Sequence, residues 1–360
     1  MTKTNDQEGM GKTMRPSLQS NRGFTLIELM VAVTLGLIIL AALTSFFVRT
    51  SANRTELERN SRQIENGRYA LSALRDDLTL AGFYADIVQP TTTVWNLTTA
   101  CVTDPATVPT NWGFKPDALA PQLPAPLFVY ADGAGRPVGC TPDYVANTDV
   151  VVVRRLNTEP VTDASLAGTP NQVFVQVSEC KDDDTNTPYL VDLGKNAANF
   201  KLKKLDCKTT ADVRRFREQL YYVRDYSVTA GDGIATLVRV ELDGDGASVI
   251  ANAVPLVEGI ENLKVDWGVD ADGNGSPETW KRCDLASPCV AADWSNVTAA
   301  RIFVLSRNIE ATTGYKDDKK YLLGLSGSTT ETNDSYKRHV YSAVISMPNR
   351  AGPREPIFSS

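Results

Sequence analysis

The length and charge of the chain limit the classes of protein to which it can belong. With 360 residues, 42% of them hydrophobic, the chain can bury a substantial core in one large or two modest globular units. Its formal net charge of -6 at pH 7 argues against a nucleic-acid-binding surface, which carries a basic excess. We therefore expect no nucleic acid among its partners.

The first element that we expect is an apolar helix behind a polar leader. Residues 1–23 are polar and contain more basic than acidic side chains, and residues 24–48 form a long apolar run. A helix of this length crosses about 30 Å of hydrocarbon. Basic residues before the run predict a cytoplasmic N-terminus and an exported body. The alternative, a cleaved secretory signal peptide, would have a shorter apolar region of about 7–15 residues.

Glu28 is the informative residue of the apolar run, because a simple membrane anchor gives no reason to keep an acid there. A carboxylate inside a membrane helix costs about 2.5–3.5 kcal/mol on insertion scales. Such an acid usually has a function and a partner. The alternative is a chance acid near the membrane interface.

The residues around Glu28, Arg-Gly-Phe-Thr-Leu-Ile-Glu-Leu at 22–29, resemble the class III signal of type IV prepilins and of type II secretion pseudopilins. In that family a membrane-embedded prepilin peptidase cuts after the glycine and methylates the new N-terminus. The resemblance implies cleavage between Gly23 and Phe24 and N-methylation of Phe24. It also implies that Glu28 pairs with the Phe24 ammonium of its own or a neighbouring subunit. Such pairing relieves two desolvation penalties together.

The helix is expected to continue beyond the apolar run, over residues 49–82. An apolar stripe recurs there every seven residues on a helix that is otherwise charged, and Gly82 follows as a stop signal. We expect the upper part of this stripe to pack against a globular body at residues 83–360. The stripe consists of Leu57, Ile64, Leu71 and Leu78, with Gly67, Leu74 and Ala81 between them.

The globular body is predicted to be α+β, with an antiparallel sheet laid on the helix. Runs rich in Val, Tyr and Ile predict the strands. A helical pattern is expected around residues 255–262, and the charge run at 317–320 is expected to be a solvated loop. The whole chain then has a type IV pilin-like fold, with a long hydrophobic N-terminal helix as the spine of a C-terminal globular domain. The expected strands are 127–130, 149–156, 172–177, 219–226, 235–242, 263–269, 298–307 and 338–347.

Three further blocks, at 62–71 with 77–83, at 256–265 and at 339–350, are similar to the minor pilin family called PilW. This resemblance implies a counterpart of the J-type pseudopilin of type II secretion, which acts in a small tip complex that primes pilus assembly. The implied location is the inner membrane, with a periplasmic globular domain, and then the pilus tip at the cell surface. The implied partners are other minor pilins, the major pilin, the prepilin peptidase, a tip adhesin and the inner-membrane assembly platform.

The six cysteines form an even set without a C-x-x-C pair, which argues against a zinc ribbon or a thioredoxin-like site. If the body lies outside the cytoplasm, disulfides are the natural expectation. Pairing of neighbours is our choice among 15 connectivities. The alternative is that some are free buried thiols. The expected pairs are Cys101–Cys140, Cys180–Cys207 and Cys283–Cys289.

A candidate calcium loop lies between two of the expected strands. Oxygen-bearing side chains at alternate positions, interrupted by glycine, match the opening half of an EF-hand loop. The pattern departs at the twelfth position, where Lys281 stands, and Glu278 could substitute there. An ordinary β-turn explains the same composition, and 243–246 is interpreted as a hairpin turn. We expect no required cofactor, and the candidate calcium ligands are Asp270, Asp272, Asn274, Ser276 and Glu278.

The sequence gives little support for catalysis. His339 is the single histidine and lies in an alternating strand pattern. No G-x-S-x-G, H-E-x-x-H, Walker A or Rossmann pattern is present. We therefore expect a structural and interaction protein and no enzyme. The alternatives are a J-like pseudopilin at the tip of a type II secretion pseudopilus, and a membrane-tethered periplasmic binding protein or enzyme.

Overall fold

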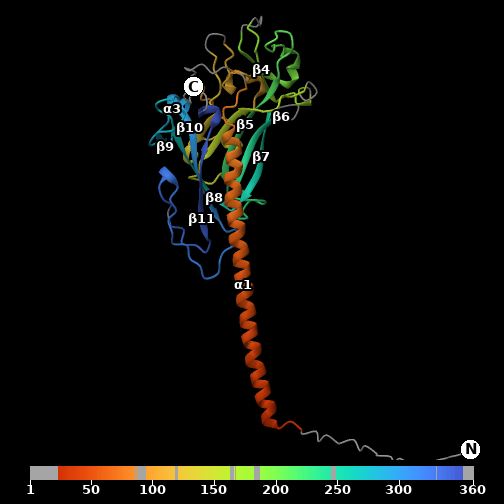
Figure 1. Cartoon of the computed structure of the whole chain (residues 1–360), viewed down its shortest axis with the longest axis vertical. Coiled ribbons are helices and arrows are strands. Elements are labelled where there is room, and N and C mark those ends of the chain that lie inside the picture. Colours follow the sequence, from red (N-terminus) through yellow and green to blue (C-terminus); the bar gives the residue numbers. More distant parts are fainter. Residues whose placement is uncertain are drawn as a thin grey trace, which may run out of the picture. The chain divides into compact units, whose positions relative to one another are not determined.

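The computed structural model of the chain divides into two compact units, Met1–Glu56 and Leu57–Ser360 (Figure 1). Except for Gly23, the leader expected at residues 1–23 lies outside the described residues. The structure describes residues 23–85, 87, 95–117, 121–162, 166, 168–181, 187–244, 249–329 and 331–351.

The helix α1 spans Leu26–Thr79 and forms almost all that is described of the first unit. It contains no proline that would interrupt its hydrogen bonds. Among the described residues it is the one helix long and apolar enough to cross a membrane, with a mean hydropathy of 2.6 in its most apolar 18-residue window. The chain leaves the helical direction at Gly82, where φ is +75°, a conformation that glycine adopts without steric cost.

The first sheet of the second unit has seven antiparallel strands. The twelve-residue strand β5 organises it, because β5 pairs with β2, with β3 and with β6. The remaining strands pair as β1 with β2, β4 with β3, and β7 with β6. The strands are β1 Leu127–Tyr130, β2 Val150–Leu156, β3 Val173–Val177, β4 Tyr189–Leu193, β5 Val213–Arg224, β6 Thr236–Gly244 and β7 Val249–Glu258.

The second sheet has four antiparallel strands in the order β11-β10-β8-β9. They are β8 Ile260–Val269, β9 Thr279–Lys281, β10 Val297–Arg307 and β11 Arg338–Ser346. Two short helices flank this sheet, α3 Ala291–Asn296 before β10 and α4 Pro348–Ala351 after β11. The unit also contains short 3₁₀ helices: η1 Pro105–Thr107, η2 Thr110–Trp112, η3 Ala131–Gly133, η4 Val138–Cys140, η5 Gly194–Asn199 and η6 Gly324–Ser326.

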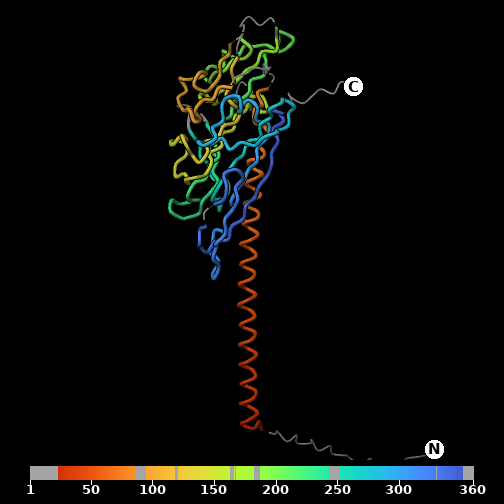
Figure 2. The backbone as a smooth tube through the Cα atoms, turned by 90° about the vertical axis from the view of Figure 1, so that its left-hand side faces the viewer, coloured from red at the N-terminus to blue at the C-terminus, as the bar shows by residue number. Residues whose placement is uncertain are grey.

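The main core joins both sheets to the C-terminal part of α1. Leu74 and Leu78 of the helix are fully buried in a cluster that includes Val153 of the first sheet and Val265 of the second. Both views place the C-terminal strand β11, in blue, beside the orange part of α1 that belongs to this unit (Figures 1 and 2). The two elements approach so closely at Gly67 that a Cβ atom there would overlap the Tyr341 ring.

The apolar stripe predicted on this helix is buried only in its upper part. Leu71 is partly buried and Leu78 fully, as expected. Leu57 and Ile64 remain 68% and 43% exposed. The buried face also includes Gln63, which the stripe did not predict. The Gln63 side-chain amide donates hydrogen bonds to two main-chain carbonyls, one in β10 and one in the residue that precedes β11.

A buried acid also ties α1 to the first sheet. Asp77 is 7% exposed, lies 3.1 Å from the Arg155 guanidinium and accepts a hydrogen bond from the Tyr221 hydroxyl. Burial and the neighbouring Asp77 carboxylate raise the pKa of the Tyr221 hydroxyl, so this group stays protonated and keeps its role as donor. The docking of α1 therefore depends on one charge pair as well as on apolar contacts.

Two sequence-based expectations are wrong. Residues 255–262 are not helical but complete β7, turn at Gly259 and begin β8. Gly259 has a φ of +74°, which allows the tight reversal. Pro255 is tolerated because, among the described strands, β7 pairs only with β6, and Pro255 lies next to an irregularity in that register.

The charge run at 317–320 is not wholly solvated either. Asp317 is fully buried and lies 3.0 Å from the guanidinium of Arg338. Two tyrosine hydroxyls, of Tyr315 and Tyr321, also donate to its carboxylate. The long loop before β11 is thus held by a buried ion pair.

We predict that Asp77→Ala destabilises the second unit by about 3–5 kcal/mol, because the buried guanidinium of Arg155 loses its counter-charge. Denaturant unfolding of the purified chain in detergent measures this free energy. Asp76→Ala is the matched control, since Asp76 is an exposed acid on the same helix. Equal stability of the two variants would contradict the proposed anchoring role.

Candidate functional site

The start of α1 places Glu28 in a specific hydrogen-bonded arrangement. The Glu28 carboxylate oxygen Oε2 accepts hydrogen bonds from the main-chain N–H of Thr25 at 3.0 Å and from the Thr25 hydroxyl at 2.9 Å. In return, the Glu28 N–H donates to Thr25 Oγ1 at 3.3 Å. This reciprocal pattern is a capping box, which satisfies free N–H groups at a helix N-terminus. Glu28 therefore has a local structural role that the sequence analysis missed, although the Thr-x-x-Glu spacing signals it.

The capping box uses only one of the two carboxylate oxygens. Glu28 Oε1 accepts no hydrogen bond within the described part of the chain. Phe24 immediately precedes the capping residue Thr25. A cation that arrives near the first turn of the helix can therefore pair with Glu28 without breaking the cap.

The side chains that follow Glu28 have no protein neighbours to cover them in this unit. Every residue from 23 to 49 is exposed, and the apolar side chains of the run lie between 52% and 86% exposed. An apolar surface of this size is not stable in water. The segment needs a lipid bilayer or other apolar helices around it.

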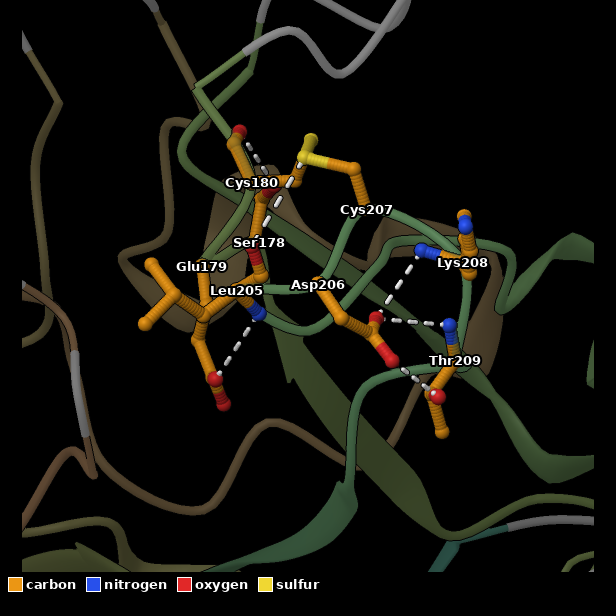
Figure 3. Close-up of a disulfide and its surroundings, with 8 residues drawn as sticks. All are labelled: Ser178, Glu179, Cys180, Leu205, Asp206, Cys207, Lys208 and Thr209. Carbon is orange, nitrogen blue, oxygen red and sulfur yellow. Dashed lines mark hydrogen bonds between the residues drawn. A yellow bond between two sulfur atoms is a disulfide. The ribbon is translucent and has the colours of Figure 1, made fainter.

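The six cysteines form the three neighbour pairs chosen from the sequence. Cys101 is bonded to Cys140, Cys180 to Cys207, and Cys283 to Cys289. Figure 3 shows the second pair, which joins the segment after β3 to a short turn. In that turn the Asp206 carboxylate accepts hydrogen bonds from the N–H groups of Lys208 and Thr209. The Thr209 hydroxyl also donates to the Asp206 carboxylate. The hydroxyl bond first, and the two N–H bonds with it, lower the pKa of Asp206 to about 2, so this carboxylate keeps its charge and its hydrogen bonds over the ordinary pH range.

The candidate calcium loop brings three of its five expected ligands together. Carboxylate oxygens of Asp270, Asp272 and Glu278 lie within 4.8 Å of one another. Each also accepts a main-chain N–H from the loop; Asp270, for example, accepts those of residues 273, 274 and 275. Asn274 directs its amide N–H2 toward Asp272 and its oxygen toward the Ser276 N–H. The donor set suits a hard cation, and the same hydrogen bonds also close an ordinary turn.

The expectation of calcium at this loop predicts that calcium raises the melting temperature of the purified chain. One ion bound at a free concentration about ten times its Kd stabilises by about 1.4 kcal/mol. Asp272→Asn should remove the increase, whereas Asp318→Asn, at an exposed acid elsewhere, should keep it. A melting temperature that does not respond to millimolar calcium identifies the loop as a plain turn. Thermal unfolding monitored by circular dichroism measures both variants.

The other residues considered from the sequence form no reactive arrangement in the described part of the chain. His339 is exposed on β11 and packs edge-on against Tyr341, with ring centroids 4.7 Å apart. Of the turn expected at 243–246, residues 243 and 244 are the last two residues of β6, and residues 245 and 246 lie outside the described residues.

Comparison with known proteins adds two family matches. Residues 18–44 match the model described as the prokaryotic N-terminal methylation motif. Residues 220–349 match the model described as Type IV pilus-assembly protein W, PilW. No curated protein sequence matches the chain. A type IV-like pilin from Thermus thermophilus is similar over 81% of this chain and 98% of its own, with 13% identical residues and a TM-score of 0.33, a likeness too weak to support an argument.

The methylation motif at the start of an apolar N-terminal helix, ahead of an antiparallel β-domain, defines the class of prepilin-type proteins. Within that class, the match over residues 220–349 confirms the resemblance to the PilW family of type IV pilus assembly. Two of the three similar blocks, 256–265 and almost all of 339–350, lie within this match, and the block at 62–71 with 77–83 lies outside it. The matched family is one of pilus assembly and not of enzymes. The helix and the motif are consistent with an inner-membrane prepilin.

Proposed function

We propose that this protein is a minor pilin that primes type IV pilus assembly and is built in at or near the pilus tip. The observation that carries the proposal is the position of Glu28, an acid in the first turn of an otherwise uncovered apolar helix. The methylation motif around it and the PilW match at the other end of the chain support the same function.

In this proposal the prepilin peptidase cuts between Gly23 and Phe24 and methylates the new N-terminus at Phe24. Cleavage creates an ammonium group four residues before Glu28. In an apolar environment each of the two charges would carry a large desolvation penalty, and the pair relieves both. The carboxylate oxygen that the capping box leaves open is available to the ammonium of the same or a neighbouring subunit.

The apolar run and the charge pair together allow the subunit to wait in the inner membrane and then to enter the fibre. The apolar run of α1 holds the subunit in the inner membrane, with the globular domain in the periplasm. Extraction transfers that run into the fibre, where the apolar helices of other subunits replace lipid. Other minor pilins, the major pilin, a tip adhesin and the inner-membrane assembly platform are the proposed partners. A J-like pseudopilin of type II secretion would use the same motif, and the match to a pilus-assembly family favours the pilus.

Two substitutions at Glu28 separate its charge from its capping role. Glu28→Gln keeps an acceptor for the capping box and removes the charge, whereas Glu28→Ala removes both. We predict that both variants are still processed and that both reduce the number of pili at least about tenfold, because the Phe24 ammonium is left unpaired. Electron microscopy of pili, with immunoblotting for leader removal, measures the two effects.

Glu58→Gln is the matched control, because Glu58 is an exposed acid on the same helix and should support normal piliation. Normal piliation by Glu28→Gln, with loss only in Glu28→Ala, would show that capping and not charge pairing is the role of Glu28. Normal piliation by all three variants would contradict any role for this residue in assembly.

A further inference from the structure

Among the described residues, the strand β11 pairs only with β10 and forms one edge of the four-stranded sheet. The Met347 N–H donates to the Thr298 carbonyl, and the Asn308 N–H donates to the Lys337 carbonyl, each at 2.9 Å. In an antiparallel pair such bonds recur at every second residue. The odd-numbered residues of β11 therefore bond to β10, and the even-numbered residues direct their N–H and C=O groups away from it.

These outward main-chain groups form what we call the open edge. None of the outward N–H groups donates a hydrogen bond to any described residue. The side chains of three of these residues are also exposed, including Val344 at 60%. The open edge consists of Val340, Ser342, Val344 and Ser346.

The open edge lacks the features that normally prevent strand pairing. Residues 340–347 contain no charge and no proline, and the register with β10 is free of bulges over its whole length. The other sheet edges in the described part of the chain differ. β7 contains Pro255 and a register irregularity, and β1, β4 and β9 are five residues or shorter. Proteins protect long sheet edges unless a partner uses them.

A basic groove lies at the N-terminal end of the open edge. It has a volume of about 540 Å³ and runs between α1 and the start of β11. Arg68, Lys319 and Lys337 line it, with His339 and two tyrosines, and none of its lining residues is an acid. Arg338, at the same place, is already paired with Glu261 and with acids of the preceding loop. A segment that pairs with β11 therefore meets a groove whose charged lining residues are all basic.

We propose that β11 accepts an extended segment of a different pilus subunit as a fifth strand, with an acidic residue of that segment over the basic groove. Main-chain hydrogen bonds to the open edge would supply the affinity, and the groove would select the charge and the register. This inference rests on the proposed function as a pilus subunit and names the surface that one of its partners would use.

Two observations argue against a second copy of this chain as the occupant. α1 and β11 run in the same direction, since Gln63 bonds to the Lys337 carbonyl and Asn349 to the Thr79 carbonyl. Antiparallel pairing of two β11 strands would therefore turn the two α1 segments in opposite directions, whereas subunits anchored in one membrane share one direction. Parallel pairing would bring two basic grooves together, and like charges repel.

Photo-cross-linking of the full chain in piliated cells tests the proposal. A photoreactive amino acid is placed at 342, 344 or 346, with position 228 as a control because Val228 is 87% exposed on another loop. We expect the three edge positions to cross-link to one extended segment of another pilin-type subunit. Successive positions should map to partner residues two apart, as strand pairing requires. Steps of three to four residues would identify a helix and overturn the proposal.

Substitutions test whether the main chain forms the contact. Ser342→Pro removes an outward N–H and no bond to β10, and Val344→Lys adds a charge that discourages pairing. With an unchanged melting temperature, each should lower cross-linking from position 346 at least about fivefold. Ser342→Ala and Val254→Lys on β7 are the matched controls. If Ser342→Pro fails to fold, Val344→Lys decides the question.

Undiminished cross-linking in the folded variants would overturn the proposal, and so would the absence of cross-links from all three edge positions in cells that make pili. Leader removal, measured in the same cells by mass, reports separately on the proposed function. A processed, pilus-supporting chain without edge cross-links contradicts only the strand addition. An unprocessed chain contradicts the proposed function itself.

Discussion

The carboxylate of Glu28 stands in the first turn of a helix whose neighbouring side chains are apolar and uncovered. The Thr25 capping box explains how this acid is held, because one of its oxygens satisfies the N–H and hydroxyl of Thr25. It does not neutralise the charge. An ammonium created at Phe24 would do so, and it would give the acid a reason to lie in a segment destined for lipid or fibre. In the proposed function, the assembly role of this helix depends on that pairing.

The globular domain meets a different requirement, which is to hold the second half of the same helix firmly. Leu74 and Leu78 supply the apolar contacts with both sheets, and the buried pair of Asp77 with Arg155 adds a charge that must be matched. The close approach of Gly67 to Tyr341 brings β11 against the helix. As a result, the strand with the open edge packs directly against the part of α1 that belongs to the globular unit.

The features set by local pattern could be predicted from the sequence, and those set by distant partners could not. All eight expected strands overlap strands of the structure, because their apolar runs and alternation reflect burial. The strand β9 is too short to show a pattern, and β4 carries Asp192, whose charge is met by the nearby amides of Asn196 and Asn199. Residues 255–262 contain a proline and mixed polarity, and only pairing with β6 makes their first half a strand. The sequence does not distinguish Asp77 from a surface acid, because its partner Arg155 lies far along the chain in β2. By contrast, the capping role of Thr25 could have been predicted from its spacing to Glu28.

The central claim is that proteolysis supplies the cation that Glu28 meets. Mass spectrometry of the intact protein, purified from its native membrane or pili, tests this most directly because it measures the N-terminus itself. The account predicts a mature chain that begins at Phe24 and carries one methyl group on its amine. A functional protein that keeps residues 1–23, or one that begins at another residue, would contradict it.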